Sequence, residues 1–308
     1  MKKKNLISVV GPTGIGKTRL AIDLAKHFST EIVSCDSRQF FKEMKIGTAS
    51  PSSEELAEAP HHFIGNLSVE DYYSIGQYEE DALKKLNELF ESYDTVILVG
   101  GSMMYEKAVL EGLNDLPEAD EDNQKKLQSV LENEGIEKLQ ELLKELDPEY
   151  FAVVDFHNHR RLLRAIDVIW QTGKKYSEQI ALSQGSRDFK ALRIGIEASR
   201  EELYDRINRR VDLMMENGLL EEARSLEKFR HLTALNTVGY AELFKYFDGE
   251  WDLDFAVSEI KKNSRRYAKR QLTWYRKAED IHYLPLGYSQ EDFNSLIKYI
   301  NEQLNLKH

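Results

Sequence analysis

Short apolar runs and amphipathic stretches alternate over the first 116 residues. Apolar, β-rich runs occupy residues 6–10 and 95–99, and a shorter one starts at residue 31. Between them, residues 18–28 and 71–90 carry apolar side chains at helical spacing. Alternating strands and helices predict a parallel α/β sheet.

The pattern changes after Pro117. No strand pattern occurs up to about residue 187, and helical periodicity covers residues 120–134, 136–146 and 158–172. A strand pattern returns at residues 191–196, and long helices are predicted over 201–226 and 254–277. We therefore expect an α/β core formed by residues 1–116 and 190–308, with an all-α domain inserted at 117–189.

A phosphate-binding motif directly follows the first predicted strand. It reads Gly11, Pro12, Thr13, Gly14, Ile15, Gly16, Lys17, Thr18, a complete G-x-x-x-x-G-K-[ST] sequence between a strand and a helix. Its backbone N–H groups converge on an anion at a helix N-terminus, Lys17 adds a charge, and Thr18 can hold Mg²⁺. The sequence thus predicts a P-loop NTPase-like core that binds a polyphosphate or pyrophosphate.

Two further strand ends narrow the chemistry. The second predicted strand ends at Asp36, which would face the bound phosphate, although an N-cap role is the alternative. The strand at 95–99 is followed by Gly100, Gly101 and Ser102, without the aspartate that nucleotide-hydrolysing enzymes use for Mg²⁺. A guanine-reading Asn-Lys-x-Asp stretch is absent from the sequence. A nucleotide-hydrolysing switch is therefore disfavoured.

Composition is that of a water-soluble protein. Hydrophobic residues make up 41% and charged residues 31% of the 308 residues. Apolar runs of about 18 residues are absent, and the first strand follows Met-Lys-Lys-Lys directly, so we expect a cytoplasmic protein without a membrane span. The single cysteine, Cys35, excludes an intramolecular disulfide.

Charge is distributed unevenly around a net value of −11. Residues 261–277 contain eight bases and no acid. At helical spacing, Arg266, Lys269, Arg270 and Thr273 share one face, and aromatic residues including Trp274 lie between them. This face suits a nucleic-acid backbone. A solvated helix face with core aromatics is the alternative.

Two smaller basic clusters also stand out. Arg160, Arg161 and Arg164 start the last long helix of the insertion. The other cluster, on the helix after the returning strand, consists of Arg206, Arg209 and Arg210. Arg206 and Arg210 lie four residues apart, so they share a face.

His61 and His62 are adjacent on an extended chain, so their side chains point apart. We expect them to be structural, or to position tRNA or a loop, rather than to form a metal-ligand pair.

Taken together, these segments resemble the tRNA dimethylallyltransferase (tRNA isopentenyltransferase) family of bacterial type. The resemblance extends over nearly the whole chain. Its most specific parts are the Asp-Ser-Arg-Gln segment at 36–39 and the Tyr-Ala-Lys-Arg-Gln-Leu-Thr-Trp-Tyr-Arg segment at 267–276. It departs from the family at Gly14-Ile15, at Ser102 in place of threonine, and at Phe156–His159.

The resemblance implies transfer of a dimethylallyl group from its diphosphate to the exocyclic amine of the adenosine 3′ of the anticodon. Residues 11–18 would bind the substrate diphosphate with Mg²⁺ on Thr18, and Asp36, Lys17 and Arg206 would be catalytic. The tRNA anticodon stem-loop would contact Asp36, Ser37, Arg38, Gln39, Ser102, Arg160, Arg161, Arg164, Val238, Gly239, Tyr240, Arg266, Lys269, Arg270, Thr273 and Trp274. A monomer is expected.

Two other functions use the same core. An adenylate isopentenyltransferase would alkylate a free nucleotide, and a small-molecule kinase would transfer a phosphoryl group from ATP. The basic helix favours tRNA over a free nucleotide, because a free nucleotide would leave this helix without a partner.

Overall fold

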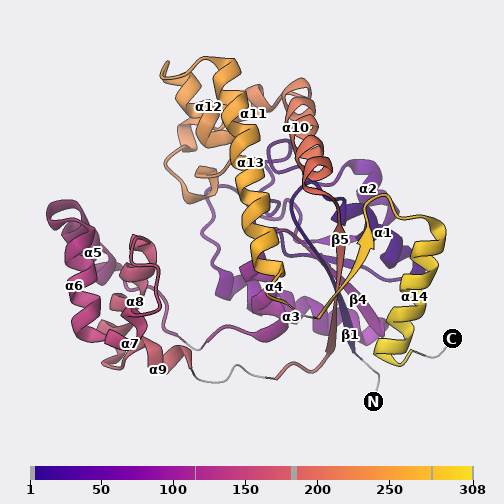
Figure 1. Cartoon of the computed structure of the whole chain (residues 1–308), viewed down its shortest axis with the longest axis horizontal. Helices are drawn as coiled ribbons and strands as arrows, with labels where there is room; N and C mark the ends of the chain where they lie inside the picture. Colours follow the sequence, from indigo (N-terminus) through magenta and orange to yellow (C-terminus); the bar gives the residue numbers. More distant parts are fainter. Residues whose placement is uncertain (1–3, 115, 182–185, 279, 307–308) are drawn as a thin grey trace. The chain divides into compact units, whose positions relative to one another are not determined.

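The structure is a computed structural model that describes residues 4–114, 116–181, 186–278 and 280–306. The chain divides into two compact units (Figure 1). One comprises Met1–Leu110 and Arg187–His308, and the other comprises Glu111–Ser186.

A parallel sheet forms the centre of the first unit. Its six strands run in the order β3-β2-β4-β1-β5-β6. They are β1 (Asn5–Val10), β2 (Ile32–Ser34), β3 (His61–His62), β4 (Thr95–Val99), β5 (Lys190–Glu197) and β6 (Ile281–Pro285). Because all pairs are parallel, the carboxyl ends of β1, β2 and β4 meet at one edge of the sheet. Ligands of such sheets bind at that edge.

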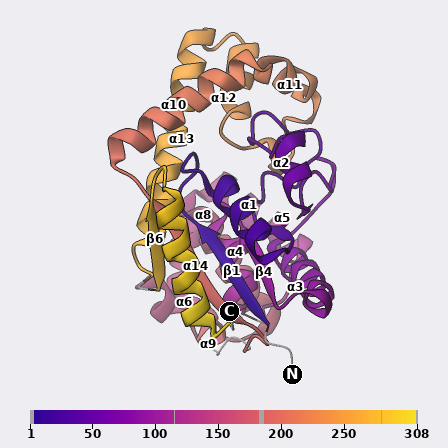
Figure 2. The ribbon, with the colours of Figure 1, turned by 90° about the vertical axis from the view of Figure 1, so that its right-hand side faces the viewer.

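Helices cover both faces of the sheet. Ile7 and Val9 of β1 pack against α1 (Lys17–Phe28) and α14 (Gln290–Leu304), which both face the viewer in Figure 2. The alternate residues Leu6 and Leu98 pack against α3 (Ile75–Ser92) and α4 (Met103–Glu111) on the opposite face. This alternation follows from the two-residue period of a strand.

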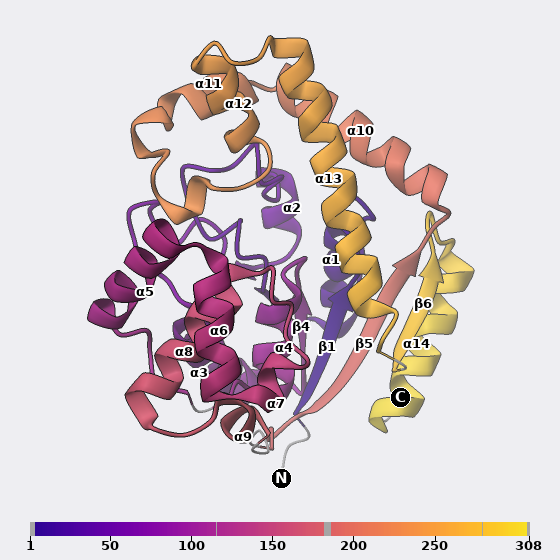
Figure 3. The ribbon, with the colours of Figure 1, turned by 60° about the vertical axis from the view of Figure 1, so that its left-hand side comes forward.

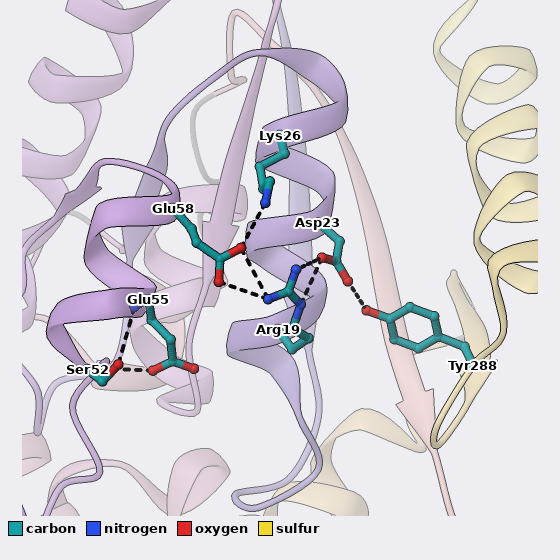
Figure 4. A network of polar contacts seen from close by, with 7 residues as sticks. All are labelled: Arg19, Asp23, Lys26, Ser52, Glu55, Glu58 and Tyr288. Carbon is teal, nitrogen blue, oxygen red and sulfur yellow. Dashed lines mark hydrogen bonds and ion pairs between the residues drawn. The ribbon is translucent and has the colours of Figure 1, made fainter.

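The helix after the phosphate loop is fastened on its outer side. Arg19 and Lys26 of α1 both contact Glu58, the last residue of α2 (Ser53–Glu58), at 3.0 and 2.8 Å. Asp23 accepts hydrogen bonds from Arg19 and, at 2.6 Å, from the hydroxyl of Tyr288 (Figure 4). The network therefore joins α1 both to α2 and to the loop before α14.

A layer of helices with its own core completes the first unit. It contains α10 (Arg200–Glu216), α11 (Leu219–Ser225), the 3₁₀ turns η1 (Glu227–Phe229) and η2 (Thr233–Leu235), α12 (Tyr240–Phe247) and α13 (Leu253–Tyr275). The single helix predicted over 201–226 is wrong. Gly218 lies in the left-handed region, with φ of 99°, so α10 and α11 are separate helices. Residues 51–66, between β2 and α3, contain the short helix α2 and the short strand β3.

In the second unit, the regular structure of the described residues is all helical (Figure 3). It consists of α5 (Glu121–Glu134), α6 (Ile136–Leu146), α7 (Pro148–Phe151), α8 (His159–Thr172) and α9 (Tyr176–Ile180). Leu127, Leu139 and Ile166 meet in its core. Buried Asp147 caps α7 by accepting the N–H of Tyr150 at 3.0 Å.

A helix that spans a bilayer must be both long and largely apolar. The longest described helix, α13, has 23 residues and carries charged side chains along its length. Within the described ranges, no helix meets both the length and the apolar content that a bilayer span requires.

Candidate active site

The phosphate loop runs from the end of β1 to the start of α1. Gly16 is the N-cap of α1, with φ of 108°, and Lys17 is the first helical residue. The ammonium group of Lys17 reaches back across the loop and donates to the carbonyl of Pro12 at 2.9 Å. The N–H groups of the first helical turn and this ammonium group together are suited to binding an anion.

The surroundings of Lys17 change the proton affinity of its ammonium group. Burial lowers the pKa of its ammonium group to about 8, with Asp36 opposing and Arg210 reinforcing the shift. A bound diphosphate would favour the protonated form of Lys17.

Three side chains converge on Gly101, directly after β4. A methyl group placed on this glycine would lie 2.9 Å from Nε2 of Gln271, 3.2 Å from Oδ2 of Asp36 and 3.8 Å from Nζ of Lys17. Gly101 is therefore required by close approach of side chains. The carboxylate of Asp36 and the ammonium of Lys17 thus both lie within 4 Å of the same point beside Gly101.

The Asp36 side chain is held at the start of a tight turn. Its Oδ1 accepts the N–H of Arg38 at 3.2 Å, and its carbonyl accepts the N–H of Gln39 at 2.9 Å. Ser102 supports the turn from β4, because its hydroxyl accepts the N–H of Ser37 at 3.0 Å. Oδ2 of Asp36 therefore remains directed toward the phosphate loop and Gly101.

Gln271 links the loop to the end of β4. Its side-chain oxygen accepts the N–H of Thr13 at 2.8 Å, and its amide nitrogen donates to the carbonyl of Gly101 at 2.7 Å. The residue is fully buried on α13. Tyr267, one helical turn earlier, donates to the same carbonyl at 3.2 Å.

Two arginines of α10 also contact the phosphate loop. The exposed Arg206 donates from Nε to the carbonyl of Gly14 at 2.9 Å. Arg210 donates to the hydroxyl of Thr13 at 2.6 Å, and its own Nε is buried without a hydrogen-bond partner. Burial lowers the pKa of Arg210. The shared helix face predicted for these residues therefore faces the phosphate loop.

A divalent cation would have few protein ligands here. In the described residues, three or more His, Cys, Asp or Glu side chains are nowhere grouped in a way that could hold a metal. Thr18 offers one hydroxyl in the first turn of α1. This donor set fits Mg²⁺, which takes most of its ligands from substrate phosphates and water.

The basic run on α13 divides into paired and unpaired residues. Contrary to the absence of counter-charges expected from the sequence, Lys261 contacts Asp212 at 2.5 Å and Lys262 contacts Glu259 at 2.8 Å. Arg266, Lys269 and Arg270 are exposed, and the described residues place no carboxylate within ion-pair distance of them. Thr273 is also exposed on this face, whereas Trp274 is half-buried.

The remaining predicted tRNA contacts lie in several places. Arg160 and Arg161 are exposed at the start of α8 in the helical unit, and Arg164 is paired with Asp167 at 3.2 Å. Tyr240 is fully buried, and Gly239 is buried beside the half-buried Val238. These contacts stay predictions, and the side chain of Tyr240 has its partner inside the protein.

A pocket of about 490 Å³ adjoins the Asp36 turn. Its walls include Arg38, Tyr73, Tyr105 and Tyr267, together with residues 232–234, 236 and 237 around η2. The guanidinium of Arg38 lies 4.5 Å from the ring centre of Tyr267. Aromatic walls and a cation over a ring are suited to a nucleobase.

Comparison with known proteins decides the family. A model of the IPP transferase family matches residues 39–278. The chain belongs to the IPP transferase family. The resemblance stated from the sequence is confirmed, and so is the predicted fold class, an α/β P-loop-like core with an all-helical insertion.

Named relatives of this IPP transferase cover almost the whole chain. A tRNA dimethylallyltransferase of Christiangramia forsetii is 52% identical over 97% of this chain and 98% of its own. The tRNA dimethylallyltransferase 1 of Phocaeicola vulgatus is 50% identical over 96% and 97%.

Solved structures of the family agree with the fold. The tRNA isopentenylpyrophosphate transferase of Bacillus halodurans is 34% identical, with a TM-score of 0.73 over 98% of this chain and 97% of that one. A eukaryotic dimethylallyltransferase acting on tRNA is 25% identical, with a TM-score of 0.83 over 97% and 78%.

Two residues that contact the phosphate loop, Gln271 and Arg210, had no role predicted from the sequence. Gln271 was not assigned, although it lies between the basic residue Arg270 and Thr273 in the family-specific segment. Arg210 was noted but given no role. A polar residue one helical turn after Tyr267, on the face opposite to the exposed arginines, was the available signal for Gln271.

Proposed function

We propose that the protein transfers a dimethylallyl group from dimethylallyl diphosphate to the exocyclic amine of the adenosine 3′ of the anticodon in tRNA, with release of pyrophosphate. The observation that carries this proposal is the placement of Lys17 and Asp36 around Gly101, 3.8 and 3.2 Å from the same point. An anion site beside a carboxylate suits a reaction in which a diphosphate leaves while an amine loses a proton.

The phosphate loop serves the leaving group. As the bond between the allylic carbon and oxygen breaks, its electron pair stays with the diphosphate. Lys17, the N–H groups at the start of α1 and Arg206 compensate this developing charge. Mg²⁺ held at Thr18 would, when bound, add positive charge to the diphosphate oxygens.

Asp36 serves the nucleophile. The adenine nitrogen forms the new bond to the allylic carbon, and one of its protons passes to Oδ2 of Asp36. The target base must leave its stack to reach this carboxylate. The aromatic pocket beside the Asp36 turn has the size and the walls to accept a base.

The exposed basic face of α13 supports tRNA as the acceptor. Arg266, Lys269 and Arg270 lie on the same helix as Gln271, which bonds the phosphate loop. A nucleic-acid backbone on this face would therefore run beside the reaction site. The relatives are named tRNA dimethylallyltransferases, and this also favours tRNA over a free adenylate as the acceptor. We also propose that the reaction takes place in the cytoplasm. We propose that the protein acts as a monomer, since one chain supplies every group used here.

The test is the mass of tRNA incubated with the full chain, Mg²⁺ and dimethylallyl diphosphate. We expect one dimethylallyl group to be added per tRNA, and nuclease digestion to locate it on the adenosine 3′ of the anticodon. Parallel incubations with adenosine monophosphate and with labelled ATP test the adenylate and kinase alternatives. Unmodified tRNA together with a prenylated adenylate or a phosphorylated acceptor would refute the proposal.

A further inference from the structure

One carboxylate outside the reaction site has an unusual set of partners. Glu222 of α11 accepts the backbone N–H groups of three consecutive residues, Lys45 at 2.9 Å, Ile46 at 2.8 Å and Gly47 at 2.9 Å. The hydroxyl of Tyr240 donates to the same carboxylate at 2.6 Å. Successive N–H groups that point to one side of a turn form an anion-binding concavity. In this protein, the anion is the protein's own side chain.

Tyr240 closes the concavity. The residue is fully buried, and burial together with the Glu222 charge raises the pKa of its hydroxyl. It therefore keeps its proton and acts as a donor. A methyl group on Gly47 would lie 2.6 Å from the ring of Tyr240, so only glycine fits this position. The ring and the carboxylate thus hold the turn from two sides.

The same turn supports the segment that carries Asp36. Directly after it, the carbonyls of Thr48 and Ala49 accept the side-chain amide of Gln39 at 3.4 and 3.0 Å. The backbone N–H of Gln39 in turn donates to the carbonyl of Asp36 at 2.9 Å. Hydrogen bonds, together with the backbone of residues 45–49, therefore join Glu222 to the Asp36 turn.

We propose that Glu222 is a positioning residue for the transfer reaction, an internal anion that fixes residues 45–49 and, through Gln39, the direction of the Asp36 carboxylate. The inference rests on the proposed function, because it takes Asp36 as the group that accepts the proton. Glu222 itself contacts neither substrate. Both of its oxygens accept hydrogen bonds within the protein.

The energetics favour a specific role for the negative charge. Hydrogen bonds to an ionised carboxylate are about twice as strong as neutral ones. Removal of Glu222 leaves three backbone donors without their partner, and a free small anion can occupy their place. Glutamine cannot restore the full set, because its amide nitrogen would face an N–H or O–H donor.

The experiment compares Glu222→Ala with Glu221→Ala, an exposed neighbour on the same helix. Single-turnover transfer to tRNA is measured with and without added formate, and pyrophosphate affinity is measured by calorimetry. We expect Glu222→Ala to lose roughly 10²-fold in transfer rate, the effect of a misplacement of about 1 Å. Formate should restore part of the rate, while pyrophosphate affinity stays within a few-fold of the wild-type value. Glu221→Ala should match the wild type.

Hydrogen exchange of the amides at 45–47 gives a readout that does not depend on activity. We expect protection in the wild type, loss in Glu222→Ala and recovery with formate. If Glu222→Ala does not fold, Tyr240→Phe takes its place. This variant removes only one of the four donors to Glu222 and should give an intermediate loss of amide protection. A folded Glu222→Ala variant with wild-type transfer, or a loss that formate does not reverse, would overturn the inference. An inactive wild type with these amides protected would instead refute the proposed function.

Discussion

Gln271 accepts the backbone N–H of Thr13 at 2.8 Å, which places a buried side chain of α13 in direct contact with the phosphate loop. The other end of its amide donates to the carbonyl of Gly101 at 2.7 Å. One residue therefore fixes the distance between the anion site and the end of β4. The helix that provides it also carries the exposed basic face at Arg266, Lys269 and Arg270.

Replacement of Gln271 by methionine should affect both stability and binding. The change keeps the side chain's length but leaves the N–H of Thr13 and the carbonyl of Gly101 without this partner. We expect the free energy of unfolding to fall by about 1–3 kcal/mol and pyrophosphate binding to weaken. Gln303→Met, at an exposed position on α14, is the control. Equal pyrophosphate affinity in the wild type and Gln271→Met would contradict the assigned link.

Diphosphate binding should weaken as pH rises through about 8, the pKa to which burial lowers Lys17. Below that pH the ammonium group is charged and binds the anion, and above it the neutral amine does not. Lys17→Arg keeps its charge across this range, because the guanidinium pKa lies above about 12. The ratio of wild-type to variant affinity, measured with one ligand at several pH values, cancels the titration of the ligand itself. A constant ratio from pH 6 to 9 would contradict the lowered pKa of Lys17.

Arg206 should act on the leaving diphosphate. Because its guanidinium already lies on the loop at Gly14, Arg206→Ala should weaken pyrophosphate binding as well as slow transfer. Arg209→Ala is a matched control, since Arg209 lies on the same helix but pairs with Asp205 at 2.7 Å. Calorimetry with pyrophosphate measures both variants. If Arg206→Ala leaves the pyrophosphate affinity unchanged, this arginine contacts tRNA instead of the diphosphate.

The exposed basic face of α13 should determine the salt dependence of tRNA binding. Removal of one phosphate contact in Arg270→Ala should lower the slope of log affinity against log salt by about one unit. Lys262→Ala changes the same basic run at a residue paired with Glu259, so its slope should stay at the wild-type value. Titrations at three salt concentrations measure the slopes. Equal slopes for the wild type and Arg270→Ala would mean that Arg270 contacts no phosphate and that the basic face is only solvated.

The parts of the fold that repeat a period were predictable from the sequence. The predicted strand at 95–99 matches β4, and the predicted helix at 136–146 matches α6, because alternation and helical spacing are local properties. The division at Gly218 was not predicted, since apolar spacing continues through the break. The short strand β3 and the edge strand β6 lack enough residues or alternation to be recognised by period.

The candidate site was predictable to the extent that it follows strand ends. The phosphate motif and Asp36 lie at the ends of β1 and β2, as their order in the sequence implied. Gln271 and Glu222 act over separations of 258 and about 175 residues. Contacts of this kind depend on tertiary packing, which no local period encodes.

The central claim is that Asp36 accepts the proton of the adenine amine while the phosphate loop holds the diphosphate. Asp36→Asn tests it most directly, because asparagine keeps an oxygen for the N–H of Arg38 but cannot take up a proton at neutral pH. The measurement is the single-turnover rate of transfer to tRNA, with pyrophosphate affinity recorded on the same protein. The account predicts a rate lower by roughly 10²–10⁴-fold with pyrophosphate affinity preserved. A transfer rate within a few-fold of the wild-type value would contradict it.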